Sequence, residues 1–156
     1  MKITVIGAGL AGSEAALQAA NAGIEVNLYE MRPEFTTGAH KTSKPAELVC
    51  SNSLGSYDET VASGLLKAEL KILNSYLMKT AFECKVPAGA ALAVDREGFS
   101  QKIQDMIENH PNINFKREKL TKIPKDGVVI VASGPLTSPE LAQEIHKLTG
   151  ENQLKF

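Results

Sequence analysis

The chain has 156 residues, with 17 lysines and arginines against 18 aspartates and glutamates and a net charge of −1. This length predicts about one domain, and 43 % hydrophobic and 22 % charged residues are ordinary for a soluble globular protein. No run of about 18 apolar residues occurs, so we expect no membrane span. Two cysteines are too few for a disulfide scaffold, which favours a reducing, cytoplasmic location. The near-zero charge excludes a whole-chain electrostatic argument for nucleic-acid binding.

The start of the chain predicts a strand–helix–strand unit. The apolar, β-rich run 2–6 predicts a buried strand, and the Ala- and Leu-rich segment 13–22 predicts a helix. The alternating segment 24–29 predicts a second strand. A strand, a helix and a strand within about 30 residues form a βαβ unit with a parallel pair of strands.

The rest of the chain predicts a long loop followed by alternating helices and strands. Residues 31–56 are polar, and a loop longer than about 12–15 residues in a compact domain is usually functional or disordered. Residues 59–81 predict one helix, because leucines recur near the 3.6-residue period, at Leu65, Leu66, Leu70, Leu73 and Leu77. The remaining expected elements are a strand or turn over 86–94, a helix over 96–109, a strand over 113–123, a buried strand over 128–132 and a helix over 138–148.

A glycine-rich turn joins the first predicted strand to the first helix, which is the context required for a dinucleotide-binding motif. Gly7 allows the tight turn, Gly9 lets a pyrophosphate approach the backbone, and Gly12 lets the helix pack closely on the strand. The N–H groups and the dipole of the helix N-terminus favour phosphate charge. We therefore predict that a dinucleotide binds to Gly7, Ala8, Gly9, Leu10, Ala11 and Gly12.

Two acidic residues accompany this turn. Glu30 ends the second predicted strand, 18 residues after Gly12, near the offset of about 20 at which an acidic residue accepts ribose hydroxyls. A carboxylate there repels a 2′-phosphate, which favours FAD or NAD over NADP. Glu14 lies in the predicted first turn of the helix and is a dipole partner, a surface charge or a residue that orders a loop beyond the nucleotide. The alternative to a dinucleotide-binding motif is a turn whose glycines are required only for steric reasons, together with an unrelated glutamate on the surface.

The segment 128–135, VVIVASGP, resembles the strand that returns to the cofactor in flavoproteins of the two-dinucleotide-binding type. That strand commonly ends in Ala-Thr-Gly. Ser133 replaces the threonine and keeps a small hydroxyl, and Gly134 permits a close approach of the backbone. The alternative is an ordinary buried strand that ends in a Gly-Pro turn.

Cys50 lies among small polar residues in the long loop. A cysteine beside a cofactor acts as a nucleophile or as an acid or base when its pKa is lowered, and His40, Lys41 and Lys44 would lower it if they fold close to the thiol. A lone thiol is more often buried and inert, so both roles stay open on composition and spacing.

Six blocks of the sequence together resemble a known family, the folate- and FAD-dependent tRNA (uracil-5-)-methyltransferases, formerly grouped as the small form of glucose-inhibited division protein A. The blocks are VIGAGLAGSEAA, LYEMRP, AELVCSNSL, GLLKAEL, VPAGAALAVDREGFSQ and ASGPLTS. They follow one another through nearly the whole chain, and LVCSNSL and ALAVDREGFS are not general flavoprotein features.

The resemblance implies a reaction. Methylenetetrahydrofolate donates one carbon, reduced FAD is the reductant, and NADPH or NADH recharges the flavin. The product is 5-methyluridine at position 54 of the tRNA T-loop. By the same resemblance, residues 7–12 and Glu30 bind FAD, Gly134 lies near the flavin, and Cys50 handles the one-carbon unit or the uracil as a nucleophile, a base or a shield. Cys84 is expected to be structural.

The predicted fold is α/β, a Rossmann-like FAD-binding domain of the two-dinucleotide-binding flavoprotein type, with a parallel sheet, flanking helices and an incomplete architecture. Residues 1–135 form the FAD-binding domain, including the 31–56 loop, and 136–156 form a helix leading into a missing downstream region, because members of the family are much longer. We expect a tRNA partner and folate and nicotinamide substrates, but no metal site and no membrane contact; the sequence specifies no oligomeric state. A general FAD- or NAD-linked oxidoreductase and an inactive nucleotide-binding module are the competing functions.

Overall fold

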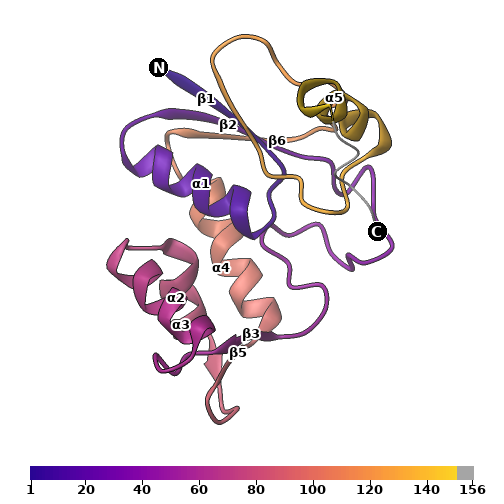
Figure 1. Ribbon diagram of the computed structural model, residues 1–156. Helices are drawn as coiled ribbons and strands as arrows, with labels where there is room; N and C mark the ends of the chain where they lie inside the picture. The colour runs from indigo at the N-terminus through magenta and orange to yellow at the C-terminus, as the bar shows by residue number, and fades with distance from the viewer. Residues whose placement is uncertain (151–156) are drawn as a thin grey trace.

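A four-stranded parallel sheet organises residues 1–150, the part of the chain that this computed structural model describes (Figure 1). Its strands are β1 (Lys2–Ile6), β2 (Glu25–Glu30), β6 (Ile113–Arg117) and β7 (Val128–Val131), in the order β6-β2-β1-β7. All three pairings are parallel, as in Ile3 opposite both Val26 and Val128. The strand order reverses at β1, which has β2 on one side and β7 on the other.

Helices α1 (Leu10–Asn21) and α4 (Arg96–Glu108) pack against each other and on this sheet. Helix α5 (Pro139–Thr149) lies apart from them, above the sheet in Figure 1. The α/β class, the parallel sheet and the flanking helices are therefore confirmed. Among residues 1–150, no helix is long and apolar enough to cross a membrane.

A second layer continues the molecule beyond α1 and α4. It contains a small antiparallel sheet, β3-β5-β4, built from β3 (Ser53–Ser56), β5 (Ala91–Val94) and β4 (Lys85–Val86). Two helices, α2 (Ala62–Ile72) and α3 (Tyr76–Glu83), lie beside it (Figure 1). The sequence did not predict β3 as a strand, because it is short and gains its ladder hydrogen bonds only from the distant β5.

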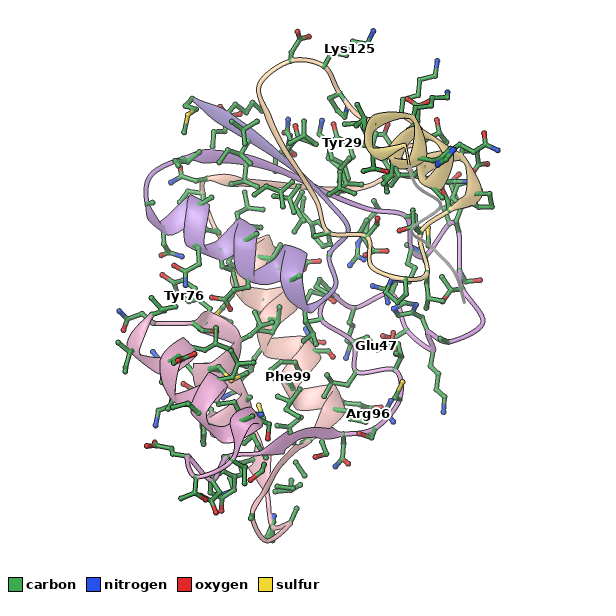
Figure 2. All side chains as sticks on the ribbon, in the orientation of Figure 1. Tyr29, Glu47, Tyr76, Arg96, Phe99 and Lys125 are labelled. Carbon is green, nitrogen blue, oxygen red and sulfur yellow. The ribbon has the colours of Figure 1, made fainter. Side chains whose placement is uncertain are left out.

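One hydrophobic core joins the two layers. From the main sheet it takes Val5, Val26 and Leu28, and from α4 it takes Phe99 and Ile103. It continues into the second layer through buried residues of α3 and β5, which are Leu77, Ala81, Leu92 and Val94. Figure 2 locates Phe99 on α4 and Tyr76 at the start of α3, just below α1. The small layer therefore shares its interior with the nucleotide fold.

The single helix expected over 59–81 is wrong, because the chain breaks between α2 and α3. Asn74 adopts a left-handed conformation with φ of 56°, and the Ser75 hydroxyl caps α3 by accepting a hydrogen bond from the Met78 N–H at 3.1 Å. The break redirects the chain, so leucines on either side no longer share one face. Leu77 is buried, but Leu65 and Leu66 are 52 % and 55 % exposed.

Other boundaries shift by smaller amounts. The strand expected over 113–123 ends at Arg117, and the segment 86–94 forms a hairpin, β4 and β5, whose turn contains Gly89 at φ of 60°. The helix expected over 138–148 is confirmed as α5, with Ser138 as its N-cap and a left-handed Gly150 as its C-cap. The division of the chain into an FAD-binding domain, 1–135, and a C-terminal region, 136–156, stays a prediction. Residues 151–156 of that C-terminal region lie outside the described part of the chain.

Candidate functional site

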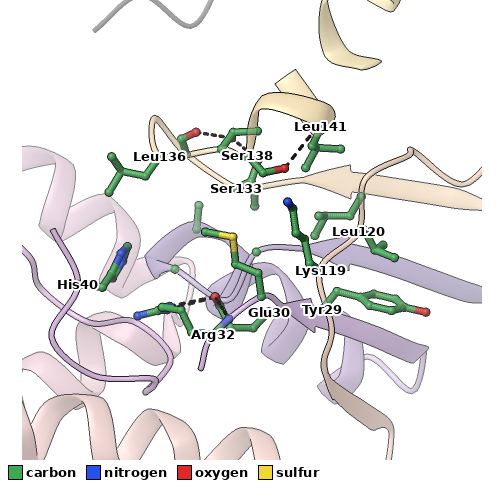
Figure 3. A pocket seen from close by; sticks show the side chains of 18 of the residues that line it. Tyr29, Glu30, Arg32, His40, Lys119, Leu120, Ser133, Leu136, Ser138 and Leu141 are labelled. Atoms are coloured by element: carbon green, nitrogen blue, oxygen red, sulfur yellow. Dashed lines mark hydrogen bonds and ion pairs between the residues drawn. The ribbon is translucent and has the colours of Figure 1, made fainter. Parts of the chain in front are cut away.

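A cavity of about 300 Å³ lies at the carboxyl ends of β1, β2 and β7 (Figure 3). In open α/β sheets, ligands bind outside the carboxyl ends of the strands, where the strand order reverses. The structure brings the separately predicted segments to this one place. The cavity is lined by the glycine turn, by Glu30 at the end of β2 and by Ser133 and Gly134 after β7.

Two glycines of the turn are required by close backbone contacts. Gly7 has φ of 98°, and a Cβ there would lie 2.8 Å from the carbonyl oxygen of Ala132. A Cβ on Gly12 would lie 1.8 Å from the carbonyl oxygen of Gly7. Any side chain at either position would collide with backbone, so these two residues hold β1, α1 and the end of β7 together.

Gly9 differs, because its missing side chain leaves open space. A Cβ there would meet nothing within 4 Å. Gly9 is the N-cap of α1 and has no capping side chain, and within residues 1–150 the backbone N–H groups of Leu10 and Ala11 donate to no protein acceptor. Unpaired N–H groups at the positive end of a helix form an anion site. The turn therefore fits the pyrophosphate of a dinucleotide.

Glu30 is buried and fully engaged by protein donors. Oε1 accepts from the Arg32 N–H at 3.1 Å and from Arg32 Nε at 2.9 Å. Oε2 accepts from the Ala8 N–H at 3.0 Å and from Arg32 Nη2 at 3.1 Å. Burial acts to raise the pKa of Glu30, but the hydrogen bonds and charge of Arg32 outweigh it and hold the pKa below its usual value. A carboxylate accepts about four hydrogen bonds, so a ribose hydroxyl that binds Glu30 has to replace one of these donors.

Arg32 is the centre of a buried ion-pair network that the sequence-based prediction missed. It is 2 % exposed and also donates from Nη1 to Glu47 Oε2 at 3.1 Å. Glu47 in turn accepts from the backbone N–H groups of Lys41 and Thr42, at 2.8 and 3.1 Å. The first half of the long loop therefore folds around one guanidinium. A hint in the sequence was that Arg32 and Glu47, two residues of opposite charge, lie in the blocks LYEMRP and AELVCSNSL, which match the family.

The cavity is lined by both charged and apolar side chains. His40 and Arg32 lie on one side, and Tyr29 and Leu120 on the other (Figure 3). The His40 Nδ1 is 2.6 Å from the hydroxyl oxygen of Thr37. Further apolar side chains come from the segment after β7 and from α5, namely Leu136 and Leu141. A lining that mixes charged and apolar side chains suits a ligand that has both phosphate and aromatic parts.

Gly134 follows β7 and turns the chain back over the glycine turn. It has φ of 66°, and a Cβ there would meet nothing within 4 Å. The Thr137 hydroxyl donates to the Gly134 carbonyl oxygen at 2.6 Å, and Ser133 Oγ lies 2.6 Å from Thr137 Oγ1. This turn therefore presents an open glycine backbone to the cavity.

Cys50 is exposed and is not among the residues that line the cavity, although the preceding residue, Val49, is. The loop is anchored on both sides of the thiol. Arg96, at the start of α4, donates to the Leu48 carbonyl oxygen, and the Asn52 side chain donates to the Val94 carbonyl oxygen at 3.2 Å. Cys50 thus follows a residue that lines the cavity and lies on a supported loop.

Cys84 and Asp95 have structural positions. Cys84 is half-buried against the core, and burial raises the pKa of its thiol. Asp95 caps α4 by accepting a hydrogen bond from the Glu97 N–H at 3.2 Å. The position of Cys84 agrees with the structural role expected from the sequence, and Asp95 is an ordinary helix N-cap.

Similarity to known proteins shows the family to which this fold and cavity belong. Residues 2–155 match the family described as Glucose inhibited division protein A. The chain belongs to this family. The resemblance seen in the sequence blocks is thereby confirmed.

The chain is also similar to two curated proteins named Methylenetetrahydrofolate--tRNA-(uracil-5-)-methyltransferase TrmFO. The protein from Sulfurihydrogenibium sp. is 55 % identical over 156 residues, and the one from Natranaerobius thermophilus is 58 % identical over 156 residues. Each match covers 100 % of this chain and 36 % of the relative. The chain therefore spans about a third of the length of these relatives.

Two solved structures share the fold. Aquifex aeolicus GidA superposes with a TM-score of 0.63 at 20 % identity, covering 81 % of this chain and 21 % of that chain. CtdE, solved in complex with FAD and a substrate, superposes with a TM-score of 0.53 at 13 % identity, covering 92 % and 39 % of the two chains. At these identities the similarity concerns the fold alone.

Proposed function

We propose that this chain is the FAD-binding part of a tRNA (uracil-5-)-methyltransferase that takes its carbon from methylenetetrahydrofolate. The observation that carries the proposal is the cavity in which an open Gly9, unpaired helix N–H groups and the end of β2 meet. It is supported by relatives with that name, which are 55 % and 58 % identical along the whole chain. Folate and nicotinamide substrates, a tRNA partner and a cytoplasmic location belong to the same proposal.

The residues of this chain bind and orient the cofactor. Leu10 and Ala11 donate their N–H groups to the pyrophosphate over the Cα of Gly9, Glu30 accepts a ribose hydroxyl in exchange for one Arg32 donor, and Gly134 gives the flavin close access to the backbone. Cys50 handles the one-carbon unit or the uracil from its supported loop.

The reaction needs a reductant for a simple reason of balance. Methylenetetrahydrofolate carries its carbon at the oxidation level of formaldehyde, so a methyl group on uracil C5 requires two further electrons. Reduced FAD supplies them when bound, and NADPH or NADH restores the reduced flavin.

A chimaera tests the proposal. This chain replaces the matching segment of the Sulfurihydrogenibium relative, and the purified chimaera is incubated with a tRNA transcript, FAD, NADPH or NADH, and methylenetetrahydrofolate labelled in its methylene carbon. We expect labelled 5-methyluridine at position 54 and none with S-adenosylmethionine as the sole donor. Methylation from S-adenosylmethionine, or oxidation of NADH on small substrates without a tRNA product, contradicts the assignment. The unmodified relative is the matched control.

A further inference from the structure

His40 is a titratable side chain that lines the cavity. The sequence suggested it only as a cation near Cys50, and the proposed function gives it no role. We propose that His40 takes up a proton when a dinucleotide binds and that its imidazolium then pairs with a phosphate oxygen of the ligand. This inference rests on the proposed function, because it takes FAD to be the ligand of this cavity.

The hydrogen bonds around His40 define its state before the ligand binds. Thr37 Oγ1 accepts from the backbone N–H groups of Ala39 and His40, at 3.4 and 3.3 Å. Its own proton is therefore left for His40 Nδ1, 2.6 Å away, which accepts it. The neutral ring consequently carries its proton on Nε2. After the ring is protonated, Nδ1–H donates to Thr37 Oγ1 in place of one of these two long backbone hydrogen bonds.

The other charged side chains that line the cavity include no cation that is free to pair with a phosphate among residues 1–150. The lining side chains include the carboxylates of Glu30, Glu47 and Glu118 and the cations Arg32 and Lys119. Both cations are already paired, Arg32 with Glu30 and Glu47, and Lys119 with Glu140 at 2.9 Å. A bound pyrophosphate adds negative charge to a cavity whose lining already contains more carboxylates than cations. Protonation of His40 supplies a cation that no carboxylate of the described residues pairs with at ion-pair distance.

The electrostatics set the direction of the effect. Burial and the nearby Arg32 charge lower the pKa of His40, while Glu47 and Glu30 oppose them, so the surroundings of the free ring favour its neutral form. A phosphate close to the ring favours its charged form and raises its pKa. The complex therefore binds the proton more tightly than the free protein does, and the affinity for the dinucleotide rises as the pH falls through the pKa of the complex.

Titration calorimetry of the full chain with FAD tests this coupling directly. Binding is measured at pH 6, 7 and 8 in pairs of buffers with different ionisation enthalpies, which reports the number of protons taken up. We expect uptake of a fraction of a proton at pH 7, and a dissociation constant that falls by about threefold to tenfold from pH 8 to pH 6, since each unit of pKa shift is worth up to tenfold. His40→Gln keeps a polar side chain that does not titrate, so its dissociation constant for FAD should stay the same from pH 8 to pH 6, whatever its absolute value. His146→Gln, at an exposed position on α5, is the control and should keep it.

The outcomes separate the two levels of the proposal. If FAD binds without proton uptake, or if His40→Gln retains the pH dependence of the wild type, the role of His40 is overturned while the FAD site stands. If the wild-type chain binds no FAD between pH 6 and pH 8, both the FAD site and the role of His40 are overturned. The proton count is measured on the wild type, so the test does not depend on the variant folding.

Discussion

The carboxylate of Glu14, on α1, accepts a hydrogen bond from the backbone N–H of Leu77, in the first turn of α3, at 2.9 Å. It also accepts from the Tyr76 N–H at 3.1 Å and from the Ser75 hydroxyl at 2.9 Å. Its negative charge thus lies at the positive end of the α3 dipole. Of the three roles that the sequence left open for Glu14, the structure therefore supports the ordering of a distant element. Glu14 joins α1 to the second layer.

Loss of this contact should weaken the whole fold. We expect Glu14→Ala to lower the free energy of unfolding by about 1–2 kcal/mol, the range for a lost helix cap with its charge. Urea denaturation measures the change. Glu69→Ala, at an exposed position on α2, is the matched control and should change stability by less than about 0.5 kcal/mol. Equal losses in the two variants would contradict a specific role for Glu14.

Substitutions at Gly9 and Gly12 should have opposite consequences. Gly9→Val places its side chain in open space, so we expect a nearly unchanged melting temperature but at least about a tenfold loss of FAD affinity, equivalent to about 1.4 kcal/mol. Gly12→Ala forces a Cβ to within 1.8 Å of the Gly7 carbonyl oxygen, so it should unfold or severely destabilise the chain. Flavin fluorescence quenching and thermal melting separate the two effects. Unchanged FAD retention in Gly9→Val would refute the placement of the pyrophosphate.

Removal of the buried Arg32 charge should lower the free energy of unfolding. Arg32→Met leaves the carboxylates of Glu30 and Glu47 without their cation, and breaking a buried pair in this way costs about 3–5 kcal/mol. The triple variant Arg32→Met, Glu30→Gln and Glu47→Gln also removes the two carboxylate charges, so it should recover part of the lost stability. Chemical denaturation of the three proteins checks the order, and a triple variant less stable than Arg32→Met alone would speak against the unpaired charges as the cause.

The carboxylates of Glu30 and Glu47 make the free energy of unfolding depend on pH in a defined direction. The folded-state pKa values of Glu30 and Glu47 lie below their ordinary values, so the unfolded chain binds protons more readily. Their contribution to stability is present above the ordinary glutamate pKa, about 4.3, and is lost as the pH falls through the lowered values. Melting temperatures should therefore drop steeply below about pH 5. Glu30→Gln should start from a lower melting temperature and show a shallower decline; an identical decline would exclude Glu30 as a contributor.

The two thiols should differ in reactivity with a thiol reagent such as Ellman's reagent. Cys50 is exposed, whereas Cys84 is half-buried with a raised pKa, so the native chain should show one fast and one slow thiol. Cys50→Ser should remove the fast phase and Cys84→Ser the slow one. In the chimaera described above, Cys50→Ser should abolish methylation without a loss of FAD binding, and full activity would end its proposed role.

Local features of this protein were predictable because their determinants lie within a few residues. The turn at Gly7, the βαβ unit and the caps Ser138 and Gly150 each follow from a backbone conformation or a hydrogen bond that the local sequence specifies. The same holds for Asp95 at the start of α4. The cavity's location followed as well, since parallel strands bring their carboxyl ends to one edge of the sheet.

Only the tertiary structure decided the features that depend on distant partners. Strand β3 exists through its pairing with β5, about 40 residues away along the chain, as in Ser53 opposite Ala93. The break at Asn74 turned leucines outward that periodicity alone placed inside. Propensity and spacing describe what a segment can form, but burial and the charges of neighbouring groups exist only after the chain has folded. The sequence therefore determined the glycine turn between β1 and α1. The fold decided that Arg32 neutralises Glu30 and Glu47, that Glu14 holds α3, and that His40 lines the cavity.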